Sequence, residues 1–450
     1  MSARLGPLRL AMTGMSLALL ANAPAASAAT EQTLYAFPSY SANGCNPDGT
    51  LLRDAAGSLY GAAWLCGGYY NGTLFKLAPP APGQTRWTLT RLYTFTGGSD
   101  GGSPNAALIM DANGAIYGTA DSGGWNFQGV VFKLTPPAPG TTRWKQTVIH
   151  TFMHDFGYKL GDGANPQGGV IMDATGALYG TTDLGGRTDD PIGFGAVYKL
   201  APPAPGITSW KETVLYRFAG GADGRNPFGA LVSDGQGALY GTTLYGGSGT
   251  CRNPMLSILG CGTVFRLTPP GPGQRGWTKT TLHRFGGGLD GGLPQGRLFL
   301  DESGALYGTT YQGGTGRCTD LLLGTVLGCG TVFRLTPPQP GQTVWKETVL
   351  YNFKGPDGVF PQGGVIKDAA GSLYGTASGG GQNGNGLAFK LSPPLPGQTR
   401  WRETVLHHFH VSTSGDTPIG ELVADTAGNF FGAAYSGGAG LSGTVFKIAP

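Results

Sequence analysis

Residues 165–186 read NPQGGVIMDATGALYGTTDLGG, and the second half of this stretch decides the fold. Its pattern, D-x-x-G-x-(aliphatic or Phe)-(Tyr or Phe)-G, occurs seven times along the chain. The aromatic positions lie 57 to 67 residues apart, at Tyr60, Tyr117, Tyr179, Tyr240, Tyr307, Tyr374 and Phe431. Such a period is too long for one coil of a β-helix and suits one blade of a β-propeller.

Each repeat contains four short runs that favour β-strands. In the fourth repeat these runs are residues 228–234, 238–243, 262–270 and 277–285, each rich in β-branched or aromatic residues and bounded by Gly or Pro. No stretch has a helical period. The sequence therefore predicts an all-β, seven-bladed β-propeller of four-stranded blades.

Two further repeated features favour structural roles. The Asp of each D-x-x-G is expected to form an Asx turn, with a calcium site as the alternative. A Trp recurs after the third strand and is expected to fasten the outer strand to the blade, at Trp87, Trp144, Trp210, Trp277, Trp345 and Trp401.

The two ends of the chain predict how the ring closes. Residues 31–37 (EQTLYAF) match a fourth strand, and residues 443–450 (GTVFKIAP) form a third strand with no fourth after it. The N-terminal strand is therefore expected to complete the last blade, which leaves no open sheet edge between the first and last blades. The propeller domain is predicted to span residues 29–450.

Residues 1–28 have the pattern of a secretory signal peptide. Arg4 and Arg9 precede an apolar run at 10–22, and Ala26-Ser27-Ala28 provides a small-residue cleavage site. Export favours disulfides, and the six cysteines predict three local pairs, Cys45–Cys66, Cys251–Cys261 and Cys318–Cys329, with free buried thiols as the alternative. The expected location is secreted or periplasmic.

Composition excludes several classes of protein. Gly (82) and Pro (32) are abundant, yet 40% of residues are hydrophobic, which argues against disorder. Only 12% are charged, with a net charge of +4 and no basic cluster, so no nucleic-acid partner is expected. No later segment is long and apolar enough to span a membrane, and we expect a monomer.

The block at 165–186, together with GTVFRLTPP at 262–270, resembles the GloVer tandem-repeat family of exported bacterial proteins. The resemblance covers almost the whole chain after residue 28. It implies export and a repeat architecture. That family carries no established activity or catalytic residues, so the resemblance implies none here.

Functional residues are expected on the face that carries the loops between blades and between second and third strands, because these loops vary most. Exposed aromatic rings beside Asn, Asp and Gln suit a sugar or peptide ligand. The predicted ligand-binding residues are Trp64, Tyr70, Trp125, Phe127, Tyr245, Tyr311, Asp189 and Asp190. The apolar tips of the loops 251–261 and 318–329 either pack together or form a lip over a ligand.

A second repeated carboxylate precedes the proline of each first strand by four residues. It occurs at Asp100, Asp162, Asp223, Asp290 and Asp357, with Asn43 in that place before Pro47 and a departure in the last repeat. It forms either a repeated Asx turn or an acidic ring around a cation.

No catalytic residue, metal site or cofactor is predicted. The leading hypothesis is a binding module for a glycan or an extracellular protein. The alternatives are a carbohydrate-active lyase or hydrolase and a structural repeat protein of the cell envelope.

Overall fold

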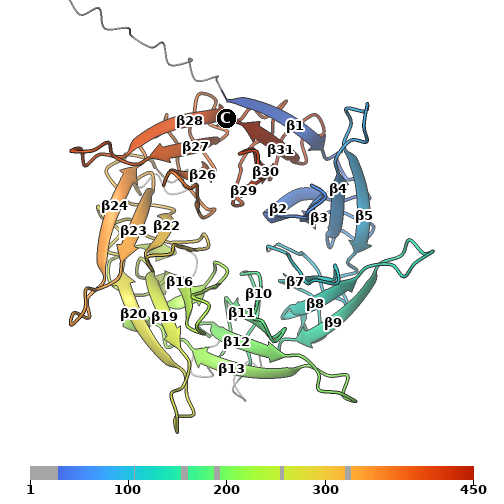
Figure 1. Ribbon diagram of the computed structural model, residues 1–450, viewed down its shortest axis with the longest axis horizontal. Coiled ribbons are helices and arrows are strands. Elements are labelled where there is room, and N and C mark those ends of the chain that lie inside the picture. Colours follow the sequence, from blue (N-terminus) through green and yellow to red (C-terminus); the bar gives the residue numbers. More distant parts are fainter. Residues whose placement is uncertain (1–28, 106, 154–160, 187–192, 254–257, 320–325) are drawn as a thin grey trace, which may run out of the picture.

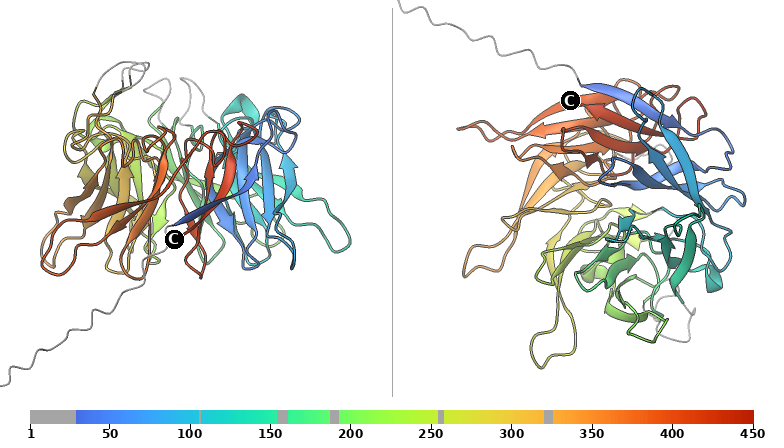
Figure 2. Two further views of the ribbon diagram at one scale, coloured as in Figure 1. Left: turned by 90° about the horizontal axis from the view of Figure 1, so that it is seen from above. Right: turned by 45° about the vertical axis from the view of Figure 1, so that its right-hand side comes forward.

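Seven antiparallel blades of the four-stranded plan stand around a central axis, as the predicted propeller requires, and only in blade 4 is the innermost strand divided into two short strands (Figure 1). The structure is a computed structural model that describes residues 29–105, 107–153, 161–186, 193–253, 258–319 and 326–450. Seen from the side, the strands run between two faces joined by loops (Figure 2). No helix in these residues is both long enough and apolar enough to cross a membrane.

The blades follow one another in chain order, and each runs from the axis outward. Blade 1 contains β2 (Cys45–Arg53), β3 (Leu59–Leu65), β4 (Thr73–Ala78) and β5 (Thr88–Thr94). Blade 2 contains β6 (Ile109–Met110), β7 (Ile116–Ala120), β8 (Val130–Thr135) and β9 (Lys145–Thr151). Blade 3 contains β10 (Ile171–Met172), β11 (Leu178–Thr182), β12 (Ala196–Ala201) and β13 (Lys211–Arg217). Blade 4 contains β14 (Arg225–Pro227), β15 (Val232–Ser233), β16 (Leu239–Tyr245), β19 (Thr263–Thr268) and β20 (Thr278–Arg284). Its loop carries the pair β17 (Arg252–Asn253) and β18 (Ile258–Leu259).

The remaining blades repeat the plan. Blade 5 contains β21 (Phe299–Leu300), β22 (Leu306–Thr310), β23 (Thr331–Thr336) and β24 (Lys346–Asn352). Blade 6 contains β25 (Ile366–Lys367), β26 (Leu373–Ala377), β27 (Leu387–Ser392) and β28 (Arg402–His408). Blade 7 contains β29 (Val423–Ala424), β30 (Phe430–Ala434), β31 (Thr444–Ala449) and, from the other end of the chain, β1 (Thr30–Ala36). Two short 3-10 turns lie at Trp125–Phe127 and Gly221–Asp223.

The ring closes with the N-terminal strand, as predicted. Strand β1 pairs antiparallel with β31, from Thr30 opposite Ala449 to Ala36 opposite Thr444. Blade 7 thus obtains its outer strand from the opposite end of the chain. Because blade 7 lies between blade 6 and blade 1, the ring is closed there.

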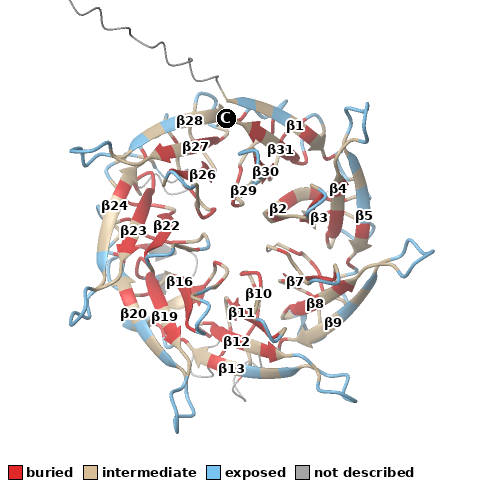
Figure 3. Cartoon of the chain, viewed as in Figure 1, coloured by how far each residue is buried: buried red, intermediate tan, exposed pale blue. Residues whose placement is uncertain are grey.

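One aromatic contact joins each pair of neighbouring blades. A Phe after the outer strand of one blade packs edge-on against an aromatic residue in the third strand of the next, as Phe95 does on Phe132 at 5.2 Å. The seven pairs are Phe37–Phe75, Phe95–Phe132, Phe152–Tyr198, Phe218–Phe265, Phe285–Phe333, Phe353–Phe389 and Phe409–Phe446. These rings are fully buried, whereas the outer strands and outermost loops face solvent (Figure 3). The core therefore runs between blades as a continuous band.

The D-x-x-G turns are Asx turns, as predicted. Asp54 Oδ1 accepts the backbone N–H of Ser58 at 2.8 Å, and the turn residue Gly57 has a φ of +82°. The second oxygen, Asp54 Oδ2, accepts the Tyr60 hydroxyl at 3.0 Å. The same Tyr–Asp bond recurs for Tyr117, Tyr179, Tyr307 and Tyr374. In these blades the hydrogen bond between the repeated Asp and Tyr thus holds both side chains in place.

The repeated Trp residues contact the preceding blade. Trp210 lies 6.4 Å from the Tyr117 ring of blade 2, and Trp345 lies 6.4 Å from Tyr240 of blade 4. The prediction assigned these rings to fastening a strand within its own blade, and in this respect it was incomplete. Because the outer strand leans over the neighbouring sheet, the Trp stabilises the interface between blades.

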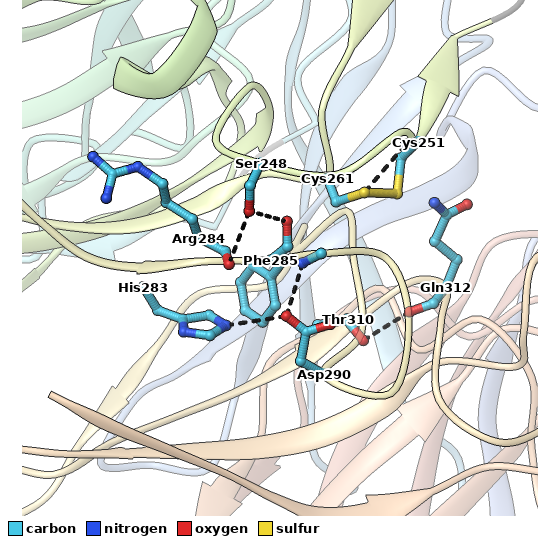
Figure 4. Close-up of a disulfide and its surroundings, with 10 residues drawn as sticks. Ser248, Cys251, Cys261, His283, Arg284, Phe285, Asp290, Thr310 and Gln312 are labelled. Carbon is cyan, nitrogen blue, oxygen red and sulfur yellow. Dashed lines mark hydrogen bonds and ion pairs between the residues drawn. A yellow bond between two sulfur atoms is a disulfide. The ribbon is translucent and has the colours of Figure 1, made fainter.

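All three predicted disulfides are present, with Cα–Cα separations of 5.4, 5.0 and 5.0 Å for Cys45–Cys66, Cys251–Cys261 and Cys318–Cys329. The Cys251–Cys261 bond lies against the linker from blade 4 to blade 5, near Phe285 and Asp290 (Figure 4). There Ser248 Oγ donates to the Phe285 carbonyl at 3.3 Å. The disulfide therefore holds the base of its loop onto the next blade.

Candidate functional site

Exposed aromatic side chains gather on one sector of the variable face. Among the described residues, five large aromatic side chains are strongly exposed, from 61% for Tyr69 to 83% for Tyr40. All five lie on three loops, between β1 and β2, between β3 and β4, and between β7 and β8. We define the aromatic sector as Tyr40, Tyr69, Tyr70, Trp125 and Phe127. It covers blades 1 and 2 and the loop that enters blade 1.

Side-chain amides hold the loops of the aromatic sector in shape. Asn71 Nδ2 donates to the carbonyls of Tyr69 at 2.8 Å and Thr96 at 2.9 Å. Tyr70 and Phe127 have φ values of +60° and +58°, a region that bulky residues rarely occupy. Such conformations persist only where the surroundings fix them, and they cluster at binding sites. The rings are therefore presented to solvent by ordered turns.

The eight predicted ligand-binding residues divide into three groups. Tyr70, Trp125 and Phe127 belong to the aromatic sector. Trp64, Tyr245 and Tyr311 are only partly exposed, because each lies at or just beyond the end of a second strand. Asp189 and Asp190 lie outside the described residues, as do Met255, Leu256 and Leu321 to Leu323 of the two predicted apolar loop tips.

The partly exposed aromatics have neighbours of their own. Tyr245 lies opposite Arg225 in the sheet and packs on the core of blades 4 and 5. Tyr311 stacks on Phe360, with ring centres 4.6 Å apart and planes 12° apart. Trp64 lies 6.2 Å from Tyr435 of blade 7. These residues do not join the exposed group.

A cavity of about 110 Å³ lies on the propeller axis. Every blade contributes to its wall the residue that follows the first-strand proline, and this shared position identifies the cavity as the axial channel. The seven residues are Asp48, Asn105, Gln167, Phe228, Gln295, Gln362 and Ile419. Glycines next to these positions form much of the remaining wall.

The turn before each of these prolines positions the channel residue. Asn165, which precedes Pro166, has a φ of +51°, and its N–H donates to the Gln128 carbonyl of the preceding blade at 2.9 Å. Its side chain also donates to the Asp121 carbonyl at 3.1 Å. Asn tolerates this left-handed backbone better than most residues. The equivalent residues of all seven repeats have positive φ, namely Asn46, Ser103, Asn165, Asn226, Leu293, Phe360 and Thr417.

An ion pair crosses one side of the channel. Arg297 of blade 5 lies 3.2 Å from Glu421 of blade 7, passing over the glycines of blade 6. Burial raises the pKa of Glu421, and the guanidinium of Arg297 counteracts this effect. The opposite charges of Arg297 and Glu421 thus neutralise each other inside the channel.

Two further carboxyl groups belong to blades 1 and 2: Asp48 lines the channel, and Asp121 lies next to the channel residue Asn105. Burial, together with the nearby charge of Asp121, raises the pKa of Asp48 to about 7, against a hydrogen bond from the Gly49 N–H. Burial also raises the pKa of Asp121 to about 6, against hydrogen bonds from Ser122, Gln167 and Trp64. Sequence reasoning missed both. The available signal for Asp48 was its place directly after the first-strand proline, a position that varies among the repeats, whereas Asp121 follows the second strand of blade 2 and had no such signal.

The carboxylates four residues before each proline form separate turns. Asp100 Oδ2 accepts the backbone N–H of Thr96 at 3.0 Å and the Tyr93 hydroxyl at 2.9 Å. The same kind of backbone bond is made by Asp162, Asp223, Asp290 and Asp357. Each of these carboxylates accepts a backbone N–H that precedes it in the chain, whereas an Asx turn uses one that follows, so the Asx interpretation is not confirmed. The acidic ring is not observed either, because each carboxylate is bound within its own linker. In the last repeat Ser414 replaces Asp without a change of spacing, which corrects the predicted departure.

Two of these turns contain His–carboxylate pairs, which the sequence had not revealed. His150 Nε2 lies 2.8 Å from Asp162, and His283 Nε2 lies 3.5 Å from Asp290 (Figure 4). Tyr216 makes the equivalent bond to Asp223, so each His substitutes for a Tyr in a structural contact. Within the described part of the chain, no three His, Cys, Asp or Glu side chains come together as a metal site.

Comparison with known proteins identifies a repeat family. The family model of the Gloeobacter/Verrucomicrobia repeat matches residues 24–253 and 322–450. No curated protein matches the chain significantly.

Several solved structures have a similar fold. A Trichoderma reesei carbohydrate-active enzyme of family AA12 is 15% identical, with a TM-score of 0.41, over 94% of this chain and 96% of that one. A putative glucose dehydrogenase of Thermus thermophilus is 16% identical, with a TM-score of 0.43, over 84% and 100%. An ulvan lyase of family PL25 is 12% identical, with a TM-score of 0.43, over 82% and 86%. At these values neither activity nor ligand carries over to this chain.

Proposed function

The chain belongs to the Gloeobacter/Verrucomicrobia repeat family, and we propose that it is an extracytoplasmic binding module whose aromatic sector holds a neutral glycan. The observation that carries the proposal is the confinement of the strongly exposed aromatic rings, among the described residues, to one sector of the variable face. Flat rings supply apolar contact area to the C–H faces of sugars and lose few rotamers on binding.

The charge of the aromatic sector favours an uncharged ligand. Residues 38–44, 66–72 and 122–129, which carry the five rings, contain no Lys, Arg, Asp or Glu. An acidic polysaccharide would call for basic side chains beside the rings, because sulfate and carboxylate groups need charged partners when they are desolvated. Arg91 of β5 donates to the Ala42 carbonyl at 2.6 Å, so one cation lies beside the sector, whereas the three loops themselves carry no charge and fit a neutral sugar chain.

The same composition argues against a protein partner. Protein interfaces are enriched in Met and Arg as well as in aromatic residues, and they bury an apolar core. The three loops contain neither Met nor Arg, and their only large apolar side chains are aromatic. Gly, Asn, Ser and Gln fill the spaces between the rings, which suits hydrogen bonding to hydroxyl groups.

The proposed location outside the cytoplasm rests on two features. The three disulfides are of a kind that persists in oxidising compartments. The signal peptide expected over residues 1–28 would deliver the chain there.

Isothermal titration of the chain from Ala29 onward tests the proposal, with neutral hexasaccharides of β-1,4-glucose, β-1,3-glucose, β-1,4-xylose and N-acetylglucosamine as probes. We expect at least one probe to bind, and Trp125→Ala with Phe127→Ala to weaken it by about tenfold or more, which is about 1.4 kcal/mol. The rings contribute area directly, so their removal lowers affinity rather than stability.

The matched control lies on the opposite face. Val344→Ala with Leu395→Ala removes two equally exposed apolar side chains from the loops between third and fourth strands. This control is expected to leave binding unchanged. If no probe binds, or if the two double variants bind equally well, the proposal is wrong.

A further inference from the structure

Two carboxyl groups, one lining the channel and one beside it, lack a basic partner. Asp48 lines the axial cavity, and Asp121 lies close enough to act on it electrostatically. Two other carboxylates that are removed from solvent do have a cation beside them: Glu421 has Arg297 at 3.2 Å and Asp223 has Lys279 at 2.8 Å. No described Lys, Arg or His makes such an ion pair with Asp48 or Asp121. A buried negative charge without compensation is costly.

Oxygen atoms around these carboxylates are also unsatisfied. The Asn105 amide donates to Gln167 and, at 3.4 Å, to Asp121 Oδ2. Gln167 donates to the same Asp121 oxygen at 3.4 Å. The other oxygens, Asn105 Oδ1 and Asp121 Oδ1, are buried and accept no hydrogen bond. Each orphaned buried acceptor requires an explanation.

The carboxyl group of Asp48 also has an oxygen without a hydrogen bond. Its Oδ1 accepts the Gly49 N–H at 2.6 Å, and its Oδ2 accepts no hydrogen bond from the described residues. Its side chain lines the axial cavity together with Asn105 and Gln167. Acceptors from two neighbouring blades thus gather beside the cavity, and Asn105 Oδ1, Asp121 Oδ1 and Asp48 Oδ2 among them accept no hydrogen bond from the described residues.

We propose that Asp48, Asp121 and Asn105 supply oxygen ligands to a divalent cation of the calcium type at the side of the axial cavity. Calcium takes six to eight oxygen ligands from carboxylates, amide carbonyls and water, in flexible geometry. The cavity of about 110 Å³ has room for the several waters that would complete the shell. Magnesium demands stricter octahedral geometry, which side chains from separate blades are less suited to provide.

The position of this site gives the cation a structural consequence. Asp48 belongs to blade 1, where the ring closes, and Asp121 and Asn105 belong to blade 2. A cation bound to both blades would tie them together at the axis. Calcium is therefore expected to raise the thermal midpoint of the protein, because a ligand of the folded state stabilises it.

Calcium titration of the chain from Ala29 onward tests the proposal, with heat and the thermal midpoint as readouts. We expect Asp48→Asn with Asp121→Asn to weaken calcium binding by roughly a hundredfold, because both charged ligands are lost. These changes remove buried charge without changing volume, so the variant is expected to fold. Gln295→Ala, in the same ring on blade 5, is the matched control and is expected to keep the affinity within roughly threefold.

Terbium luminescence gives a second readout at the site. Trp64 lies against Asp121 and is expected to sensitise bound terbium, so Trp64→Phe is expected to reduce the emission while calcium binding persists. Three results overturn the proposal: no response to millimolar calcium, an equal response in the Asp48→Asn, Asp121→Asn variant, or stabilisation by methylammonium but not by calcium. None of these readouts depends on the glycan.

Discussion

At the residue scale, the glycines near the axis set how closely the blades can approach. A Cβ built on Gly296 would lie 2.5 Å from Gly364 N and 2.6 Å from Gly363 C, both backbone atoms of the next blade. Backbone atoms have little freedom to move aside in a closed ring. Packing therefore favours a glycine two residues after the first-strand proline, which explains why six of the seven repeats have one there.

Gly296→Ala is expected to lower the free energy of unfolding by about 1–3 kcal/mol, the usual cost of overpacking. Gly276→Ala is the control, because a Cβ there meets nothing within 4 Å and the residue lies in an exposed loop. Urea unfolding of both variants compares them directly. Equal midpoints for the two would contradict the packing argument.

Individual residues also differ in whether their role could be predicted from the sequence. Tyr60 and Asp54 were recognisable because their spacing repeats and their chemistry explains a turn. Tyr40 was missed because nothing in its loop repeats, and only the structure shows that it is exposed. Tyr245 was assigned to the variable face, yet it packs on the core because β16, like β3, is two residues longer than the other second strands.

At the element scale, the interfaces between blades contain carboxyl pairs. Glu403 on β28 occupies the register position that Lys279 occupies on β20, opposite the matching Leu of the third strand. Lys279 pairs with the linker residue Asp223 at 2.8 Å. Glu403 instead faces Asp357, and its Oε1 accepts no hydrogen bond. Burial, together with the charge of Asp357, raises the pKa of Glu403 to about 7.

This raised pKa predicts a pH dependence. A folded-state pKa above the ordinary value gives stability that is full below about pH 4.5 and is lost as the pH rises through about 7. Glu403→Gln replaces the carboxyl group by a neutral amide, so the variant does not lose this stability as the pH rises. It is expected to be more stable than the native chain by about 1 kcal/mol at about pH 8, after allowance for solvent screening. The gain should shrink towards about pH 5.

Thermal midpoints measured across this pH range check the expectation. Glu403→Lys should also stabilise at the higher pH, because it would reproduce the Lys279–Asp223 pair. Glu302→Gln, in an exposed turn, is the control and should show no such trend. A Glu403→Gln gain that is the same at every pH would argue against the carboxyl pair.

The closing strand is the second feature at this scale. Removal of residues 29–36 would leave the edge of β31 unpaired, remove the buried side chain of Leu34 and expose the core residues that it covers. We expect the shortened chain to lose about 3 kcal/mol or more of stability and to self-associate through the open edge. Light scattering after size exclusion, with thermal unfolding by circular dichroism, measures both effects. A monomer with an unchanged midpoint would show that the closure is dispensable.

At the scale of the whole molecule, the sequence predicted the architecture better than the sites. The seven repeats, the strand exchange at Thr30–Ala36 and the three disulfides follow from local patterns, and all are present. The axial cavity could not be predicted, because closure of the ring brings residues about 60 positions apart, such as Asn105 and Gln167, to one wall. The motif reveals that such positions repeat, but not that they face the axis.

The central claim, that the aromatic sector binds a glycan, is tested most directly by hydroxyl-radical footprinting with and without the tightest-binding hexasaccharide. The five rings are exposed and reactive, so each reports its own contact with the ligand. The account predicts that Tyr70, Trp125 and Phe127 become protected, while Val344 and Leu395 on the opposite face stay equally reactive. Protection confined to other residues, or no protection of these three rings under saturating ligand, would contradict it.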